Sequence, residues 1–579
     1  MTPHFDVAIV GGGISGLYTA WRLATQKDGP PLKVCLHECS DRLGGRIHTV
    51  PVPDTPDTRV ELGAMRFPPS HEMVGALLKE LSVETEPFPG QDFLHMYLRG
   101  RALPLSTAPG PPQPVPDLPF RLTGTEPSHP FLLAAVALVR IVPGIQLTAT
   151  GFQTGTPPQP ITTADWDRIL STIEVDGRPL WQWGFWNLLN RVVSNEAYEY
   201  LLAAFGVEST VSNWNAFCAV RLLCTIFGDA MNSNLQHPVG GWGELVQALE
   251  TALAQLSNCT LVKSSKLLQV DKDAPADAPF VLTFEDAAQP TDTPPHRGPF
   301  ITSTIVKVEA TNLVLALPVR ALELVNFNGL NQAGAAAGDM GRELMSLLLN
   351  VIRVPAFRIY VNYATPWWQQ WCGWSSGYTV TDLPLRQVFY GFGLSGPHPA
   401  FLPTIIGSGL KGLDGKFDSS VLMATYSNAV SAEFWSGLLN PGEFICEFSG
   451  SDANLHLPLR DAVNRQLQEL HGYEMNLPAG TWTCAVDWSA DPFGAAWHAW
   501  RPNVDITKEI VKMRKPLYNV RLFLCGEAFS HVQGWIEGAI CNTEMMLQEH
   551  FHLKQAAWIP AGYPLGPGQP AASATTTNT

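Results

Sequence analysis

Residues 5–16 read FDVAIVGGGISG, a short apolar run that leads directly into a glycine-rich turn. The apolar run predicts a buried β-strand, and residues 17–24 (LYTAWRLA) have the spacing of a helix. A second apolar run, residues 33–37, follows the helix and ends at Glu38. Strand, glycine turn, helix, strand and acid stand in the order that a dinucleotide-binding βαβ unit requires.

The glycines of this turn have separate physical tasks. Gly11 permits the tight turn, Gly13 lets the backbone approach a pyrophosphate, and Gly16 lets the helix pack closely on the strand. The helix then begins at Ile14 and Ser15, whose N–H groups and positive dipole end would face the phosphates. Glu38 lies 22 residues after Gly16, where its carboxylate can accept hydrogen bonds from a ribose.

The composition indicates a large globular protein. The chain has 579 residues, which corresponds to roughly two to four domains, with 45% hydrophobic and 15% charged residues. Its net charge of −15 disfavours nucleic acid and anionic membrane surfaces as partners. The first residues lack signal-peptide features, and the ten cysteines have neither zinc-ribbon nor redox spacing. We therefore expect a cytoplasmic protein without a metal site and without a membrane span.

The residues after Glu38 distinguish FAD from a nicotinamide cofactor. They continue as CSDRLGGR, residues 39–46, and complete the pattern E-x-x-x-R-x-G-G-R. This pattern resembles the flavin-containing amine oxidase superfamily. The resemblance implies FAD as the cofactor, with Arg46 at the phosphates and the backbone at Gly45 passing the flavin.

Distant parts of the chain resemble the same superfamily. Residues 525–528 (CGEA) follow an apolar strand, residues 534–539 (GWIEGA) open a long helix, and residues 238–242 read PVGGW. The resemblance implies that Glu527 holds the ribityl chain, that the helix after Gly534 points toward the flavin pyrimidine, and that the backbone near Leu267 meets the adenine. The complete set of predicted cofactor residues is Gly11, Gly13, Ile14, Ser15, Gly16, Glu38, Cys39, Gly45, Arg46, Gly63, Ala64, Met65, Arg66, Leu267, Glu527, Gly534, Trp535 and Ile536.

One loop indicates the branch within the superfamily. Residues 61–68 read ELGAMRFP and resemble the G-x-M-R loop of L-amino acid oxidases. The resemblance implies that Arg66 clamps the substrate carboxylate, which a planar guanidinium can bind through two parallel hydrogen bonds. A structural ion pair with Glu61 is the alternative. Monoamine oxidases lack an arginine in this loop.

Further substrate contacts follow from the same resemblance. Residues 377–390 (GYTVTDLPLRQVFY) resemble a segment that carries a substrate-facing tyrosine. Tyr390 matches best, although the adjacent Phe389 leaves the register uncertain by one residue. The predicted catalytic residues are Arg66, Tyr390 and Trp535. The predicted substrate-binding residues are these three together with Gly534 and Trp497. Ordinary packing is the alternative for each of these aromatic side chains.

Two departures from the superfamily pattern concern the chemistry. No histidine occurs between residues 218 and 236, where snake-venom members carry one, so no base of that kind is assigned. The strand that usually places a lysine under the flavin reads RIYV here, with Arg358 in the lysine position. This substitution puts the details of the reaction with oxygen in doubt.

The resemblance implies oxidative deamination of an L-amino acid. The Cα–H would leave as hydride to flavin N5, water would convert the imino acid to a 2-oxo acid and ammonia, and oxygen would take the electrons to give hydrogen peroxide. The expected partners are the L-amino acid and molecular oxygen, in a homo-oligomer. The alternatives are an L-amino acid monooxygenase that forms an amide, an amine or polyamine oxidase, and a flavin-binding interaction protein without turnover.

The expected fold class is α/β, with three interleaved regions. A Rossmann-type FAD-binding domain is joined to a mixed-sheet substrate domain and a helical domain. A tail rich in Pro, Gly, Ala and Thr is expected to be disordered. The boundaries are 1–64, 236–322 and 488–555 for the FAD-binding domain, 65–122 and 323–487 for the substrate domain, 123–235 for the helical domain, and 556–579 for the tail.

Overall fold

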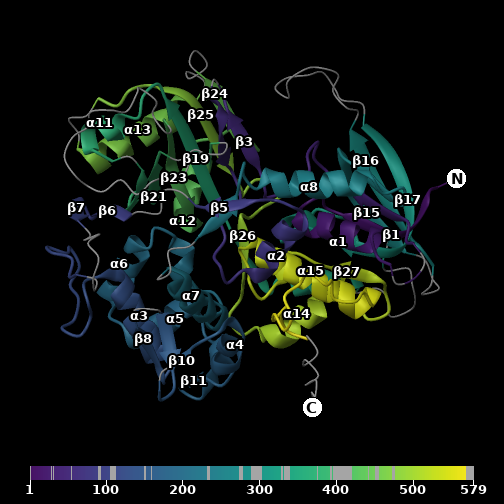
Figure 1. The fold of residues 1–579 in the computed structure, drawn as a ribbon, viewed down its shortest axis with the longest axis horizontal. Coiled ribbons are helices and arrows are strands. Elements are labelled where there is room, and N and C mark those ends of the chain that lie inside the picture. Colours follow the sequence, from purple (N-terminus) through teal and green to yellow (C-terminus); the bar gives the residue numbers. More distant parts are fainter. Residues whose placement is uncertain are drawn as a thin grey trace.

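The computed structural model describes residues 2–568, with internal gaps. The gaps are residues 28, 30, 54, 89–92, 105–112, 149–150, 158, 231–234, 273–277, 288–302, 328–329, 331–339, 375, 392–393, 396–419, 441, 450–455 and 473–475. Figure 1 shows three regions side by side: a first sheet with its covering helices, a second sheet, and a group of helices below the second sheet.

The first sheet contains the predicted βαβ unit. Its strands run in the order β14-β2-β1-β17-β16-β15, and β27 also pairs with β17. β1 pairs in parallel with both β2 and β17, as expected for a doubly wound sheet. The strands are β1 (His4–Val10), β2 (Val34–His37), β14 (Cys259–Val262), β15 (Ser265–Lys272), β16 (Phe280–Ala287), β17 (Ser303–Leu315) and β27 (Leu522–Leu524).

Helices from three parts of the chain cover this sheet. α1 (Ile14–Ala24) packs against α15 (Ile536–Phe551) and α8 (Gly243–Ala254). Residues 17–24 were predicted to be helical, and the helix begins three residues earlier, directly after the glycine turn. The strands and covering helices all fall within the segments that the sequence analysis gave to the FAD-binding domain.

The second sheet is mixed. Its order is β24-β25-β19-β23-β21-β20-β6-β7, in which β20 and β6 are parallel and the other pairs are antiparallel. Helices α11 (Trp367–Cys372), α12 (Ala429–Ser436) and α13 (Leu457–His471) lie near it (Figure 1). Its strands are β6 (Phe93–Leu98), β7 (Arg101–Pro104), β19 (Ala356–Tyr363), β20 (Gly377–Thr381), β21 (Gln387–Tyr390), β23 (Val421–Asn428), β24 (Ile445–Ser449) and β25 (Gly480–Asp487).

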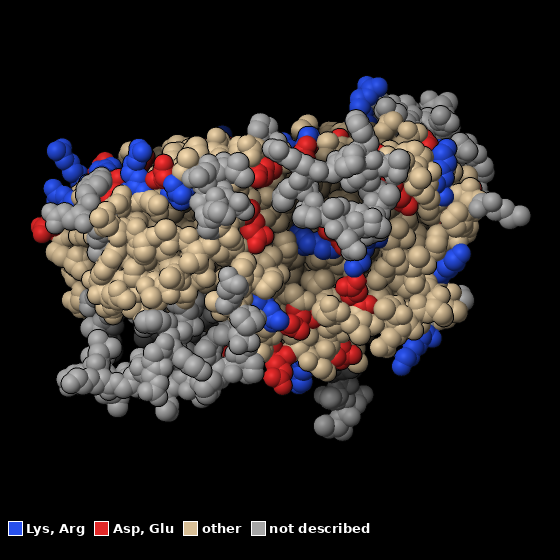
Figure 2. Space-filling model, turned by 90° about the horizontal axis from the view of Figure 1, so that it is seen from above, with Lys and Arg blue, Asp and Glu red and all other residues tan. Residues whose placement is uncertain are grey.

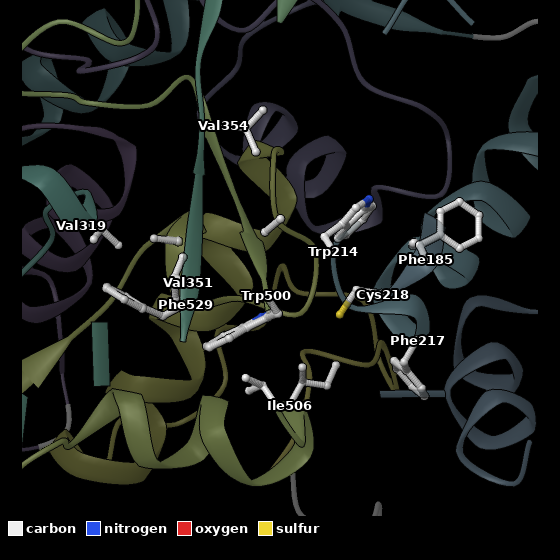
Figure 3. Packing of buried hydrophobic residues seen from close by; sticks show 14 of the residues in the cluster. Phe185, Trp214, Phe217, Cys218, Val319, Val351, Val354, Trp500, Ile506 and Phe529 are labelled. Carbon is white, nitrogen blue, oxygen red and sulfur yellow. The ribbon is translucent and has the colours of Figure 1, made fainter. Parts of the chain in front are cut away.

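The third region is mainly helical. It includes α3 (Pro130–Ile141), α4 (Thr163–Ser171), α5 (Phe185–Val192), α6 (Asn195–Ala204) and α7 (Ala216–Ala230). Figure 3 shows how it joins the rest of the molecule: Trp214, Phe217 and Cys218 lie near Trp500 of β26 (Trp497–Trp500) and near Ile506. These side chains belong to one buried cluster, so the helical region shares its core with the first-sheet region. The α/β fold class with these parts is confirmed.

The remaining elements are smaller. In chain order they are β3 (Thr49–Val52), β4 (Thr55–Glu61), α2 (Glu72–Glu80), β5 (Thr85–Pro87), β8 (Ile145–Thr148), β9 (Gly151–Thr154), β10 (Gln159–Pro160), β11 (Glu174–Val175), β12 (Arg178–Pro179), η1 (Leu180–Gln182), η2 (Glu208–Val211), β13 (Gln236–Pro238), α9 (Val319–Glu323), α10 (Met340–Leu348), β18 (Val351–Val354), β22 (Leu394–Ser395), α14 (Ile506–Arg514) and η6 (Glu527–Phe529). None of the described helices has the length and apolar character needed to cross a membrane. On the face in Figure 2, acidic and basic side chains are interspersed, and a broad area carries neither.

The C-terminal segment corrects one prediction. Residues 556–568 were expected to belong to a disordered tail, but the structure packs them onto the first-sheet region. Ile559 and Leu565 are buried in its core, and the Tyr563 hydroxyl donates a hydrogen bond to Glu537 at 2.5 Å. Pro and Gly content signalled an irregular backbone, while the apolar residues between them supplied enough burial to order it. The rest of the tail, 569–579, lies outside the described residues.

Candidate active site

The glycine turn leaves an opening in front of α1. Gly11 has φ 104°, and a Cβ there would lie 2.5 Å from the Ala316 carbonyl oxygen. A Cβ on Gly16 would lie 1.8 Å from the Gly11 oxygen, so both positions require glycine. A Cβ on Gly13 would meet nothing within 4 Å, and α1 has no side-chain cap at this end. Uncapped N–H groups, those of Ile14 and Ser15 included, therefore face open space that suits a phosphate.

Glu38 lies beside this opening. Its Oε2 accepts a hydrogen bond from the Gly12 N–H at 2.6 Å, and its Oε1 accepts from the N–H and hydroxyl of Ser40 at 2.9 and 2.7 Å. The Cys39 thiol lies 3.4 Å from the same carboxylate. The Glu38 carbonyl oxygen in turn accepts the Ser265 N–H at 2.8 Å, two residues before the buried Leu267 on β15. The predicted ribose and adenine contacts therefore lie at one end of the first sheet.

Arg46 and Glu527 are 481 residues apart and form an ion pair at 2.7 Å. The Glu527 carboxylate also accepts hydrogen bonds from the backbone N–H groups of His498 and Gly534 at 2.8 and 2.7 Å. Burial alone would raise the pKa of Glu527, but Arg46 and His498 together lower it to about 2. The pair joins the loop after Glu38 to the segment that precedes α15.

His498 has no counterpart in the sequence predictions. Its side chain is fully buried, its Nδ1 lies 2.8 Å from a Glu527 oxygen, and burial lowers its pKa although Glu527 acts in the opposite direction. Its Nε2 has no hydrogen-bond partner among the described residues. A buried orphan ring nitrogen beside the predicted cofactor acid fits a site that a polar group completes. Isolated histidines give no sequence signal, which is why this residue was missed.

The loop that carries Arg66 lies against the segment that contains Gly45 and Arg46. A Cβ on Gly45 would lie 3.2 Å from the Gly13 Cα, so the two glycine segments touch. A Cβ on Gly63 would lie 1.6 Å from the Arg46 carbonyl oxygen, and the Ala64 N–H donates to that same oxygen at 3.2 Å. The predicted cofactor residues Gly45, Gly63 and Ala64 thus come together, and Met65 is buried next to them.

Arg66 is partly accessible to solvent and lies between aromatic rings. Its guanidinium carbon is 5.1 Å from the centre of the Phe88 ring and 6.0 Å from that of Phe389. Burial lowers the pKa of the guanidinium, and the nearby Arg358 acts in the same direction. Within the described chain no acidic side chain pairs with Arg66. The alternative of an ion pair with Glu61 is not seen, because Glu61 instead binds the N–H of Trp242 at 2.7 Å and the Thr49 hydroxyl at 2.9 Å.

Three side chains hold the backbone just before Arg66. Arg358 Nη1 donates to the Glu61 carbonyl oxygen at 2.9 Å and also to that of Gly63, while its guanidinium lies 4.7 Å from the Tyr426 ring centre. The Tyr360 hydroxyl donates to the Glu61 oxygen at 2.6 Å. Trp488 Nε1 donates to the Leu62 oxygen at 2.7 Å. Arg358, the residue that stands where the superfamily resemblance expects a lysine, thus anchors the backbone of the loop that carries Arg66.

Tyr390 does not face this site, and the prediction that it contacts substrate is wrong. Its hydroxyl lies 2.8 Å from His471 Nε2 and 3.2 Å from the Thr379 hydroxyl, and its ring packs in the core with Trp367 and Trp368. Successive side chains of a strand point to opposite faces, so a one-residue difference in register moves the contact to the neighbour. Phe389 is the residue of β21 that faces Arg66.

Tyrosines from neighbouring strands take the place expected for Tyr390. Tyr378 of β20 stacks on Phe389 with ring centres 5.1 Å apart, and burial raises the pKa of its hydroxyl while Arg66 lowers it. Tyr426 of β23 is a further electrostatic neighbour of Arg66. These two hydroxyls and the guanidinium form the polar end of the candidate substrate site. The alternation of β20 was readable in the sequence, but its position relative to Arg66 was not.

The segment before α15 forms another side of the candidate substrate site. Gly534 is exposed, and a Cβ there would lie 3.3 Å from the Trp497 ring. Trp497 meets Trp214 edge-on with ring centres 5.6 Å apart. Trp535 and Ile536, both partly exposed, stand at the start of α15, which has no side-chain cap. The predicted residues Gly534, Trp535 and Trp497 therefore lie together at an uncapped helix N-terminus.

A cavity lies behind Trp535. It is lined by Trp214, Arg221 of α7 and His71, among other residues, and the His71 ring meets Trp535 edge-on at 4.8 Å. Burial and then the charge of Arg221 lower the pKa of His71 to about 3, so this histidine is uncharged at neutral pH. It is consequently a weak base.

Comparison with known proteins identifies the family. Two uncapped helix ends, the glycine cradle and the paired Arg46 and Glu527 form the candidate cofactor site. Residues 14–409 match the family model described as flavin containing amine oxidoreductase, which covers more than half of the chain. The chain belongs to this family. It is a flavin-dependent amine oxidoreductase by family, and the residues of the cradle fit a flavin dinucleotide.

The relatives are distant in sequence. The chain is 24% identical to Aplysianin-A of Aplysia kurodai over 94% of its own length and 90% of that protein, and 25% identical to Achacin of Lissachatina fulica over 94% and 93%. A shorter region, 19% of the chain and 20% of the relative, is 39% identical to tryptophan 2-monooxygenase of Pseudomonas savastanoi. A redesigned putrescine oxidase superposes with a TM-score of 0.60 at 14% identity, covering 96% of this chain and all of the other.

Proposed function

We propose that this protein binds FAD and oxidises an L-amino acid to the 2-oxo acid, ammonia and hydrogen peroxide. The observation that carries the proposal is Arg66: a mostly enclosed guanidinium, packed between aromatic rings, with no acidic partner in the described chain. An enclosed cation without a counter-ion is costly, and a substrate carboxylate would supply the missing charge. An amine that lacks a carboxylate would not supply this negative charge.

The chain's own side chains bind and orient the substrate in this proposal. Arg66 holds the carboxylate, with the Tyr378 and Tyr426 hydroxyls beside it. Trp497 and Trp535 enclose the amine-bearing carbon next to the uncapped start of α15. Burial among these rings favours the neutral amine, because a low-polarity environment disfavours the ammonium form. When bound, the flavin would supply the acceptor for the Cα hydride and the route of both electrons to oxygen.

The overall reaction balances without another reactant. One amino acid, one oxygen and one water give one 2-oxo acid, one ammonium ion and one hydrogen peroxide. No nucleophile is needed, and the chain's role is to position and desolvate the substrate.

Matched pairs of substrates test the carboxylate clamp. Each L-amino acid is compared with the amine that lacks its carboxylate, by following anaerobic bleaching of the flavin absorbance. We expect reduction by an acid and little by the matching amine. Arg66→Ala should lower kcat/KM for the acid by about 30- to 1000-fold, which corresponds to about 2–4 kcal/mol for removing one partner of an enclosed charge pair.

The control variant is Arg59→Ala. Arg59 lies on β4, two residues before Glu61, and its side chain is 44% exposed beside Glu244. It should leave both the flavin content and kcat/KM unchanged. Equal rates of wild type and Arg66→Ala on the amino acid, or a preference for the amine, would overturn the proposal.

The product distinguishes the main rival. The partial similarity to tryptophan 2-monooxygenase favours, as second candidate, conversion of the amino acid to an amide with loss of the carboxyl carbon. Both reactions need the same clamp. Stoichiometric 2-oxo acid and peroxide support the oxidase, whereas amide and carbon dioxide support the monooxygenase.

A further inference from the structure

Three donor side chains of different chemistry meet at the edge of the second sheet. They are Glu443, Cys446 and His456, and their ligand atoms all lie within 4.8 Å of one another. Glu443 is in the turn before β24, Cys446 is on β24, and His456 directly precedes α13. β24 is an edge strand of the sheet, and this group is remote in sequence from every residue of the candidate active site.

Each donor is oriented by its own neighbour. Cys446 is 1% exposed and belongs to the core under α13. The His456 ring stacks on Phe448 with centres 5.2 Å apart and planes 16° apart. The Glu443 Oε2 accepts hydrogen bonds from the N–H and side-chain amide of Asn440 at 3.1 and 3.0 Å, which fixes the carboxylate and leaves Oε1 available.

We propose that Glu443, Cys446 and His456 bind one Zn²⁺, with water as the fourth ligand. Thiolate, imidazole and carboxylate are the donors that Zn²⁺ takes in tetrahedral sites, at about 2.0–2.3 Å from the ion. Donors at those lengths are about 3–4 Å apart. The observed separations are within 4.8 Å. Mg²⁺ and Ca²⁺ are disfavoured, because they require oxygen ligands and a thiol is unsuited to them.

Binding would link the two ends of a short stretch of chain, residues 443–456. The thiol of Cys446 would lose its proton to solvent as the Zn–S bond forms, and no electron transfer is involved. The ion would then tie the turn after α12 and the edge strand β24 to the first turn of α13. The site is independent of the proposed function. It was not expected from the sequence, because the spacing E-x₂-C-x₉-H matches none of the common zinc patterns.

Metal content and affinity measure the site directly. The full chain is stripped with a chelator, returned to metal-free buffer and titrated with Zn²⁺ by calorimetry, and bound metal is counted by mass spectrometry after desalting. We expect one zinc per chain and a higher midpoint of thermal unfolding. Cobalt in place of zinc should show the absorption of a thiolate bound to cobalt.

Matched cysteines provide the control. Cys484 on β25 is also 1% exposed, and it lies on the opposite face of the same sheet. Cys446→Ala should lower zinc affinity at least tenfold, and Cys484→Ala should not. His456→Ala, at a half-buried position, gives a second test if the buried cysteine variant does not fold. Less than half a zinc per wild-type chain, or equal affinity in wild type and His456→Ala, would overturn the proposal.

Discussion

Replacing Arg358 perturbs the anchor of the loop that carries Arg66. The guanidinium binds the carbonyl oxygens of Glu61 and Gly63 and covers the Tyr426 ring. In Arg358→Ala both carbonyls lose a charged donor. The Glu61 oxygen keeps the Tyr360 hydroxyl at 2.6 Å, whereas no second donor to the Gly63 oxygen is found in the described structure.

The size of the effect follows from these contacts. A hydrogen bond from a charged group contributes about 1.5–3 kcal/mol and an enclosed cation–π contact about 1 kcal/mol. We expect Arg358→Ala to lower the free energy of unfolding by about 3–5 kcal/mol. Arg358→Lys keeps the charge but lacks the planar fork, so about half of that loss is expected. Tyr360→Phe removes one neutral donor and should cost about 1 kcal/mol.

Denaturant unfolding measures the loss of stability, and steady-state kinetics measure the effect on substrate binding. Unfolding midpoints should fall in the order wild type, Tyr360→Phe, Arg358→Lys and Arg358→Ala. The loop carries Arg66, so KM for the amino acid should rise about tenfold in Arg358→Lys while the amount of bound flavin stays constant. A midpoint of Arg358→Lys equal to that of wild type, with unchanged KM, would refute the anchor.

Three further outcomes are expected. Gly13→Val should give folded but colourless protein, because its side chain fills the open space before α1; yellow protein with full flavin content would contradict this. Burial raises the pKa of Glu61 to about 8 despite hydrogen bonds from Trp242 and Thr49. The folded protein therefore holds this proton more tightly than the unfolded chain. The resulting contribution to the free energy of unfolding is complete below the usual pKa of 4.5 and is lost as pH rises through 8. Glu61→Gln should remove this slope, which is at most about 1.4 kcal/mol per pH unit, in unfolding measured from pH 5 to 9. With the carboxylate on Arg66, a D-amino acid would place its side chain where the amine belongs, and a peroxide assay should show almost no turnover.

Local motifs made the cofactor region predictable. The glycine turn, Glu38 and the segments around Glu527 and Gly534 each contain residues that only a few backbone geometries allow. Their constraints are steric, as the blocked Cβ positions at Gly11 and Gly16 show. The sequence therefore indicated the βαβ unit that begins at β1 and the family, although not the direct contact between residues as distant as Arg46 and Glu527.

The substrate-contacting residues could not be predicted from the sequence of a single strand. Alternation along β21 required Phe389 and Tyr390 to point to opposite faces, but which face carries the site depends on the position of β21 between β20 and β23. That position is a tertiary property. The contact of His498 with Glu527 escaped prediction for the same reason, because the two residues come from different elements. The donor group around Cys446 escaped prediction because its spacing matches none of the common zinc patterns.

Two neighbouring arginines have unequal roles, and the difference bears on the choice of substrate. Arg358 Nη1 donates to the backbone carbonyls of Glu61 and Gly63, and the charge of Arg358 lies beside Arg66. A carboxylate approaching Arg66 is attracted by both charges. A diamine, which carries a second positive charge in place of the carboxylate, would meet both charges without a partner acid in the described chain. A redesigned putrescine oxidase shares the fold, but the two arginine charges support the proposal that the substrate is an amino acid rather than a polyamine.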